Sequence, residues 1–126
     1  MSSERLARRA WSRRRWPHFR PHEFYRGSPE GQPGISIALL DVLERLRVSA
    51  GEVPLPILSG VRSAAHNSAV GGVEGSQHLL GTAADIPYGM VTTEEAIMAG
   101  AVGIGSRGPY AVHVDVREGP AARWTY

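Results

Sequence analysis

The segment Ala111–Val116 alternates valine with polar side chains, and a period of two is that of a β-strand. On such a strand the three valines share one face and would pack on a core. His113 and Asp115 share the other face, where a buried imidazole and a buried carboxylate must find partners. The segment therefore predicts a half-buried strand whose polar face either meets water or contributes to a polar site.

A second polar pair, His78 and Asp85, lies seven positions apart on either side of Gly81. A tight turn at Gly81 would bring a loop residue next to a residue of the strand predicted over 82–86. With His113 on a facing strand, two imidazoles and one carboxylate would converge. Catalytic zinc takes three ligands of these types and keeps one position open for water. Because this spacing is common in proteins, the hypothesis depends on the third residue.

The chain contains no cysteine, which excludes a disulfide scaffold and every thiolate metal site. Any metal must then be held by histidine and carboxylate. The length of 126 residues suits one domain, or one small domain with an arm. No apolar run approaches the roughly 18 residues of a membrane span. No apolar stretch follows the basic N-terminus, as a secretory signal peptide would require.

Charge divides the chain in two. Residues 1–26 contain eight arginines and two glutamates, whereas residues 27–126 contain six arginines and ten acidic residues. We therefore predict a basic N-terminal arm (1–26) and a domain (27–126), with a Pro/Gly-rich loop from Gly27 to Gly34 between them. Three interpretations of the arm compete: a solvated segment with a helix over 3–16, a docking arm for a larger assembly, and a patch for nucleic acid or a membrane surface.

Helices are predicted where apolar residues recur at helical spacing behind a capping residue, and strands where short apolar runs are bounded by glycine or proline. The clearest helix covers 36–50, with Leu40, Leu43 and Leu46 on one face and Gly51 after its end. Further helices are predicted over 63–70 and 93–99, and strands over 55–58, 82–86, 102–105 and 111–116. This mixture predicts an α+β domain in which a small antiparallel sheet packs with helices.

Six segments carry a further signal. In chain order they are Ser59-Gly60-Val61-Arg62-Ser63, His66-Asn67, Val70-Gly71-Gly72, Ser76-Gln77-His78-Leu79-Leu80-Gly81-Thr82-Ala83-Ala84-Asp85-Ile86, His113-Val114-Asp115 and Arg123-Trp124. Together they resemble the zinc D-Ala-D-Ala peptidase family. That family includes bacterial D-Ala-D-Ala carboxypeptidases and phage peptidoglycan endopeptidases, and it shares its fold with the hedgehog signalling domain. The resemblance runs from about Phe19 to Trp124.

The resemblance implies a Zn²⁺ ion held by His78, Asp85 and His113. It also implies that Arg62 binds a substrate carbonyl or carboxylate and stabilises a developing oxyanion, a task that suits a permanently charged guanidinium. A structural ion pair is the alternative role for Arg62. Ser76 would line the substrate cleft or hold the loop that carries His78.

The general base is the open point of this interpretation. Several branches of the family have an acidic residue three positions before the last ligand, where this chain has Tyr110. In the branch with a His-x-Asp strand, the nearest carboxylate is Asp115. It would either take the proton from the attacking water or orient a ligand. The chain also departs from the family pattern at Val61 and at Arg117-Glu118-Gly119, which would alter the cleft wall.

The implied function is hydrolysis of an amide bond in peptidoglycan stem peptides, of the D-Ala-D-Ala carboxypeptidase or endopeptidase type. Without a signal peptide, the protein would be made in the cytoplasm and reach the cell wall in a phage particle or after lysis. The arm would then dock on virion or tail proteins, and nucleic acid is not an expected partner. The alternative is an assembly component of a phage-like particle that keeps this fold without needing catalysis.

Overall fold

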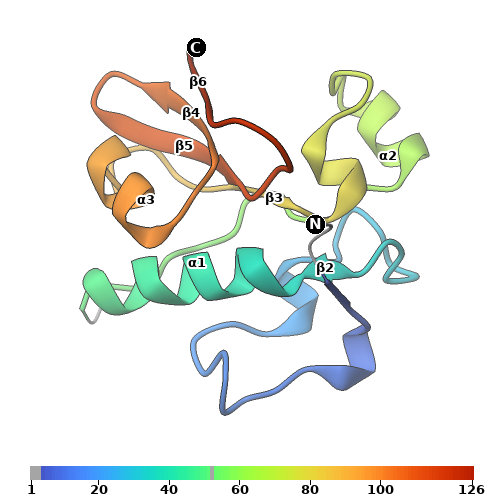
Figure 1. Ribbon diagram of the computed structural model, residues 1–126. Coiled ribbons are helices and arrows are strands. Elements are labelled where there is room, and N and C mark those ends of the chain that lie inside the picture. The colour runs from blue at the N-terminus through green and yellow to red at the C-terminus, as the bar shows by residue number, and fades with distance from the viewer. Residues whose placement is uncertain (1–3, 52) are drawn as a thin grey trace.

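Helix α1 (Ile37–Ser49) lies between the N-terminal segment and the main sheet (Figure 1). The computed structural model describes residues 4–51 and 53–126. The Ser36 side chain caps the helix by accepting a hydrogen bond from the backbone N–H of Leu39 at 3.2 Å. The buried face consists of Leu39, Leu40, Val42, Leu43 and Leu46. The apolar stripe predicted over 36–50 is therefore confirmed.

The main sheet has the strand order β3–β5–β4–β6. Its strands are β3 (Ala83–Asp85), β4 (Gly103–Arg107), β5 (Tyr110–Asp115) and β6 (Ala122–Thr125). The predicted strands β3, β4 and β5 are confirmed. Strand β5 runs antiparallel to both of its neighbours, β3 and β4. Strand β6 adds to the predicted set. It pairs with β4 in the parallel direction, so the sheet is mixed.

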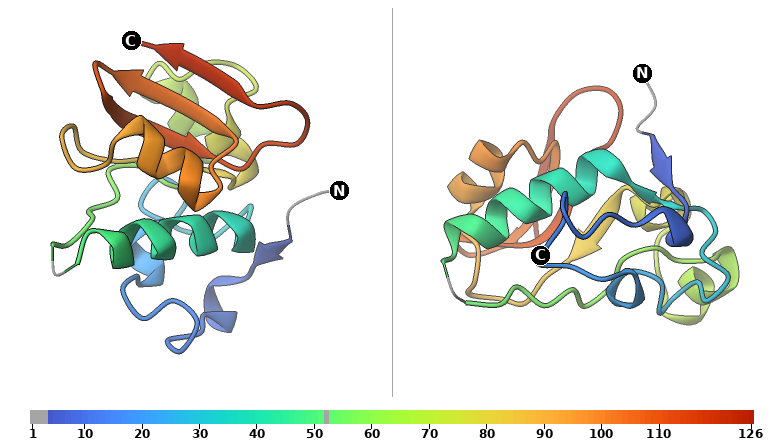
Figure 2. Two further views of the ribbon diagram at one scale, coloured as in Figure 1. Left: turned by 60° about the vertical axis from the view of Figure 1, so that its left-hand side comes forward. Right: turned by 90° about the horizontal axis from the view of Figure 1, so that it is seen from below.

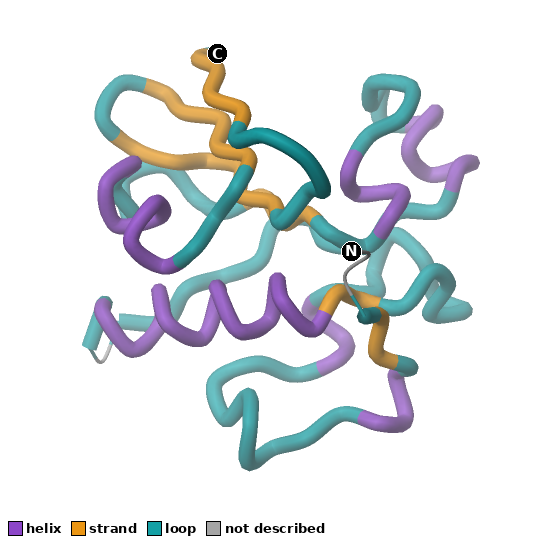
Figure 3. The backbone as a smooth tube through the Cα atoms, in the orientation of Figure 1, coloured by secondary structure: helices purple, strands orange, loops and turns teal. Residues whose placement is uncertain are grey.

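Helix α3 (Thr93–Ala99) contacts both α1 and the sheet, and Figure 2 shows it lying between them. Its N-terminus is a capping box formed by Thr92 and Glu95. Helix α2 (Ala64–Ala69) begins after the predicted cap Ser63 and contacts the 3₁₀ turn η3 (Gln77–Leu80), which leads toward β3. The helices and strands together form the predicted α+β fold (Figure 3).

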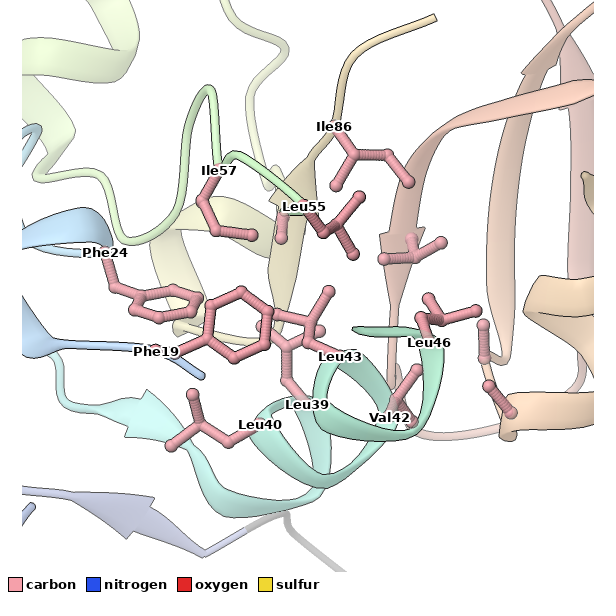
Figure 4. Packing of buried hydrophobic residues seen from close by; sticks show 14 of the residues in the cluster. Phe19, Phe24, Leu39, Leu40, Val42, Leu43, Leu46, Leu55, Ile57 and Ile86 are labelled. Atoms are coloured by element: carbon pink, nitrogen blue, oxygen red, sulfur yellow. The ribbon is translucent and has the colours of Figure 1, made fainter. Parts of the chain in front are cut away.

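One apolar cluster joins α1, the sheet and the N-terminal segment. Figure 4 shows the side chains that meet above α1: Phe19, Phe24, Leu39, Leu40, Val42, Leu43, Leu46, Leu55, Ile57 and Ile86. Val114 of β5 lies in this cluster, and Val116, just after the strand, packs against it, as predicted. Val112 does not pack in the core. A register shift between β4 and β5 leaves it without a partner on β4, and its side chain lines a small surface hollow.

The strand predicted over 55–58 is not formed. Leu55 and Ile57 are buried, as the alternation requires, but the segment makes only an isolated bridge from Ser59 to Asp85. The backbone N–H of Leu58 donates to the carbonyl of Asp85 at 2.9 Å. Pro56 has no N–H to donate, so the ladder cannot continue beyond this point.

The expected helix over 3–16 begins at a residue outside those described; over 4–16 the chain contributes to the core instead of forming that helix. Strand β1 (Arg5–Leu6) pairs with β2 (Ile35–Ser36), and the turns η1 (Arg8–Ala10) and η2 (Pro21–Glu23) follow β1 along the chain. The Tyr25 hydroxyl donates to the carbonyl of Leu6 at 3.0 Å and accepts from the N–H of Ile35 at 3.1 Å. Packing of several buried aromatic rings in this segment outweighs its local helical propensity.

Asp41 on α1 anchors this segment. One oxygen accepts from the indole N–H of Trp16 at 2.9 Å, and the other accepts from Nη2 of Arg15 at 2.9 Å. The boundary at residue 26 stays a prediction about folding units, but Trp16, Phe19, Phe24 and Tyr25 belong to the common core. Among the residues described, no helix has the length and apolar character that a membrane span requires.

Phe19→Ala should therefore destabilise the whole protein, because a buried ring on the N-terminal side of the boundary is lost from the shared core. We expect about 3–5 kcal/mol in the free energy of unfolding, measured by urea denaturation. Arg14→Ala, at an exposed position, should change it by less than about 0.5 kcal/mol. Equal stability of the two variants would mean that residues 1–26 do not fold with the rest.

Candidate metal centre

The pairing of β3 with β5 determines where two of the three candidate ligands lie. Asp85 and His113 are register partners on these adjacent antiparallel strands. Directly opposite residues on adjacent strands project their side chains to the same face of the sheet, about 5 Å apart. The polar face predicted for β5 is thus the face that receives the carboxylate of β3.

The third candidate ligand, His78, is presented by the turn η3. The Ser76 side chain accepts a hydrogen bond from the backbone N–H of His78 at 3.2 Å and so caps the turn. Gly81 ends it with φ of 72°, a left-handed conformation that glycine adopts without steric cost. The tight turn expected at Gly81 is therefore present, and it lets the chain reverse from His78 into β3.

His78, Asp85 and His113 lie close enough to share one ion. One ligand atom from each lies within 4.8 Å of the others. Oδ1 of Asp85 is 3.1 Å from Nε2 of His78 and 3.0 Å from Nδ1 of His113. Both histidines are buried and the carboxylate is half-buried. The structure thus brings together the three residues whose convergence the sequence predicts.

The outward-facing ring nitrogens of these histidines fix their tautomers. Nδ1 of His78 lies 2.7 Å from the carbonyl oxygen of Gly60, which can only accept, so it must carry a hydrogen. Nε2 of His113 lies 2.8 Å from Oδ2 of Asp115, an ionised carboxylate, and must also carry a hydrogen. In the neutral imidazoles, both inward-facing nitrogens then present lone pairs.

Three acceptor atoms therefore face one point: two imidazole lone pairs and the Oδ1 atom of Asp85. This arrangement is repulsive unless a cation, or additional protons, lie between them. Histidine and carboxylate are ligands that Zn²⁺ accepts, and outer partners that hold the second ring nitrogen are typical of zinc-binding histidines. The residues present therefore fit a zinc ion.

The pKa values of Asp85 and His113 also indicate that this point attracts positive charge. Burial raises the pKa of Asp85, but where the inward-facing nitrogens of His113 and His78 carry protons in place of a metal, their hydrogen bonds to Asp85 outweigh burial and hold this pKa well below its usual range. Burial lowers the pKa of His113, but its hydrogen bonds to Asp115 and Asp85 raise it above the ordinary value. Two ionised carboxylates that flank one imidazole attract a cation, or a proton where no metal is bound.

Asp115 lies behind His113, away from the point where the three acceptors meet. Its side chain is 0% exposed. Its Oδ1 accepts from Nε of Arg117 at 2.9 Å, and its Oδ2 accepts from Nη2 of the same guanidinium at 2.7 Å. Burial raises the pKa of Asp115, but hydrogen bonds from His113 and Arg117 hold it well below its usual range.

Gly103 makes room for this buried carboxylate. It is the register partner of Asp115 on β4. A Cβ atom at position 103 would lie 2.3 Å from each oxygen of Asp115, far inside contact distance. Glycine within a strand weakens the strand and commonly marks such a close approach. Gly103 is the first residue of β4, so the close approach lies where this strand begins.

Arg62 is held beside the candidate centre by three different acceptors. Nε donates to Ser59 at 3.0 Å, Nη1 to the side-chain oxygen of Asn67 at 3.1 Å, and Nη2 to Oδ2 of Asp85 at 3.1 Å. The ion pair expected as the alternative role of Arg62 is therefore formed. It holds Oδ2 of Asp85 and so turns Oδ1 toward the two histidines.

The candidate centre opens onto a hollow of about 530 Å³. The residues around it are Arg62, Gly71, Gly72, Val73, Gly75, Ser76, Gln77, His78, Asp85, His113, Arg117, Trp124 and Tyr126. A larger hollow of about 700 Å³ between α1 and α3 lies elsewhere and contains none of the candidate ligands. The smaller hollow is therefore the one associated with the chemistry.

Trp124 and Arg117 also line the hollow; neither is among the predicted catalytic, metal or substrate-binding residues, although the segment from Arg117 to Gly119 is expected to alter the cleft wall. The Trp124 ring contacts the His113 ring, with 5.1 Å between centroids, and the Arg117 guanidinium lies 5.2 Å from the centroid of the Trp124 ring. Their positions depend on β6 and on the connection before it, which the apolar pattern does not predict. Tyr110 does not line the hollow and contacts Tyr88, and His66 is exposed on α2.

Comparison with known proteins agrees with this geometry. A family model described as Peptidase M15 matches residues 17–114, which include all three candidate ligands. No curated protein matches the chain. Peptidases of this family are in general zinc-dependent. The match covers more than half of the chain, and it begins close to Phe19, where the sequence resemblance begins. The chain therefore belongs to the peptidase M15 family.

Proposed function

We propose that this protein is a zinc peptidase that hydrolyses an amide bond in peptidoglycan stem peptides. The observation that carries the proposal is the meeting of three acceptor atoms, from His78, Asp85 and His113, beside an open hollow. Family membership supports peptide hydrolysis as the reaction. Peptidoglycan as the substrate rests on the sequence resemblance.

In this proposal the chain prepares the site before any substrate arrives. When bound, Zn²⁺ supplies a Lewis acid that polarises a carbonyl group and lowers the pKa of a water molecule. The Gly60 carbonyl and Asp115 keep the ring nitrogens of His78 and His113 in the ligating tautomer. Ser76 holds the turn that carries His78 and also borders the hollow.

Arg62 has two roles in this proposal. Its contact with Oδ2 orients Asp85. A guanidinium has five N–H donors, and the three protein acceptors use three of them, so two remain. Because Arg62 lines the hollow, these remaining donors are available to a substrate carbonyl and to the oxyanion that develops from it.

For Asp115 we favour an orienting role over that of general base. A base must reach the proton that it removes, directly or through one water. Asp115 is fully buried, both of its oxygens accept from Arg117, and the ring of His113 separates it from the point where the three acceptors meet. These contacts suit a carboxylate that holds a ligand in its orientation.

The second candidate function is an assembly component of a phage-like particle in which catalysis is not required. One observation favours it: among the described residues, no carboxylate other than Asp85 lines the hollow.

Docking of the N-terminal segment on virion or tail proteins, and delivery by a phage particle or after lysis, belong to both proposals. Exposed Arg9, Arg13 and Arg14 support docking. Trp16 is buried and Trp11 is half-buried against it, which does not favour stacking on nucleic acid.

Zinc removal tests the peptidase proposal. Zinc-loaded protein should release new amino termini from purified peptidoglycan, a chelator should stop the release, and added zinc should restore it.

His113→Ala should lose bound zinc and activity together, with activity falling by more than about 100-fold, because a direct ligand matters more than an outer partner. His66→Ala, at an exposed position on α2, is the matched control and should retain both. A zinc-loaded protein that cleaves none of several wall chemistries would favour the assembly role.

Asp115→Asn separates the orienting role from the base. If Asp115 orients His113, zinc affinity should fall by about 10- to 100-fold, and saturating zinc should restore most of the activity. Competition with a chromogenic chelator measures the affinity, and peptide release measures the activity. Unchanged zinc affinity, with activity still lost at saturating zinc, would instead identify Asp115 as the base.

A further inference from the structure

The two arginines that line the hollow differ in how many of their nitrogens are engaged. Every nitrogen of the Arg62 guanidinium donates to a protein acceptor. Arg117 uses only Nε and Nη2, both toward Asp115. Within residues 4–51 and 53–126, no acceptor receives a hydrogen bond from Nη1 of Arg117. One complete terminal amino group of Arg117 is therefore available at the edge of the hollow.

Arg117 is held rigidly although 26% of its side chain is exposed. Its backbone N–H and its Nε both donate to Oδ1 of Asp115, at 3.1 and 2.9 Å. Its Cζ atom lies over the Trp124 ring, 5.2 Å from the centroid, which is within the range of a cation–π contact. A donor that is fixed on one edge and on one face loses little conformational entropy when it binds a ligand through its free edge.

The charge balance around the hollow favours an anionic ligand. Two arginines and two aspartates form two ion pairs, Arg62 with Asp85 and Arg117 with Asp115. These four side chains are neutral in sum, so a divalent cation at the candidate centre gives the site a net positive charge. Among the described wall residues, only Asp85 is acidic. An anionic group that enters the hollow therefore meets net attraction, and the one carboxylate on the described wall, Asp85, is paired with Arg62.

We propose that Arg117 is a specificity-determining residue that binds a substrate carboxylate near the scissile amide. This inference rests on the proposed peptidase function. Trp124 contacts both His113 and Arg117, so one indole ring separates the free amino group from the candidate centre. An extended peptide covers such a span in a few residues, at roughly 3.5 Å each. The carboxylate is either the C-terminus of the substrate or a free carboxylate within a stem peptide.

Matched peptides test this assignment with the zinc-loaded full chain. One stem peptide has a free C-terminal carboxylate, the second has a C-terminal amide, and the third combines the amide with an internal free carboxylate. For the wild type, kcat/KM for a carboxylate peptide should exceed that for the fully amidated peptide by about 10- to 100-fold, as expected for a charge-assisted hydrogen bond. The first and third peptides distinguish the two sources of the carboxylate. Calorimetric Kd values for the same peptides provide a readout that does not require turnover.

At saturating zinc, Arg117→Gln should abolish this preference: kcat/KM for the carboxylate peptides should fall about 10- to 100-fold further than kcat/KM for the amidated peptide, because the lost interaction is specific to the carboxylate. Arg47→Gln is the control variant, since Arg47 is half-buried on α1, does not line the hollow and donates to the carbonyl of Gly51. Zinc content is measured for each variant, because Arg117 also contacts Asp115. An equal loss for all three peptides would mean that Arg117 acts only through Asp115, and would overturn the inference.

Failure of this inference and failure of the proposed function give different results. Cleavage without any preference for a carboxylate overturns the role of Arg117 and leaves the peptidase intact. A Kd preference that Arg117→Gln abolishes, in a protein that cleaves no peptide, supports the role of Arg117 and removes the peptidase proposal. A protein that binds none of the peptides overturns both.

Discussion

The pairing register of β3 and β5 is the constraint on which the site depends. It sets Asp85 opposite His113, and a shift of one residue would turn every side chain of the strand to the other face. The register is protected by burial on the opposite face, where Ala84 and Val114 lie in the core as partners. The hydrophobic core therefore also fixes the meeting of the polar side chains. Stability and site geometry share one cause.

Each candidate ligand is held by a partner that lies outside the ligand set. The Gly60 carbonyl holds His78, Asp115 holds His113, and Arg62 holds Asp85. Both carboxylates also have an arginine, so no buried charge is left without compensation. The rigidity of the site comes from these outer contacts, and they explain how three acceptor atoms are kept together against their mutual repulsion.

Local patterns in the sequence predict much of this structure. Capping residues and apolar spacing locate all three α-helices, and the valines of β5 locate the central strand with its polar face. The convergence of His78, Asp85 and His113 is also expected, because a strand pair and one glycine turn suffice to produce it. Pro56 limits the strand predicted over 55–58 locally, whereas two other failures of prediction are decided by distant contacts. Strand β6 has little apolar alternation of its own and is held by β4. The segment over 3–16 has helical spacing, yet the residues around Trp16 fold onto α1 because their rings are buried there.

The outer partners could be predicted only in part. Asp115 lies two positions after the candidate ligand His113 in the sequence, so its contact with the site can be inferred. Arg117 reaches the site through the chain reversal after β5, which the sequence pattern does not predict. The close approach of Gly103 to Asp115 carries a consequence for how this protein can vary. Any side chain at position 103 would require a shorter residue at 115, and a shorter residue at 115 would release the imidazole of His113 on the same strand. Two positions twelve residues apart are therefore constrained to evolve as a single unit.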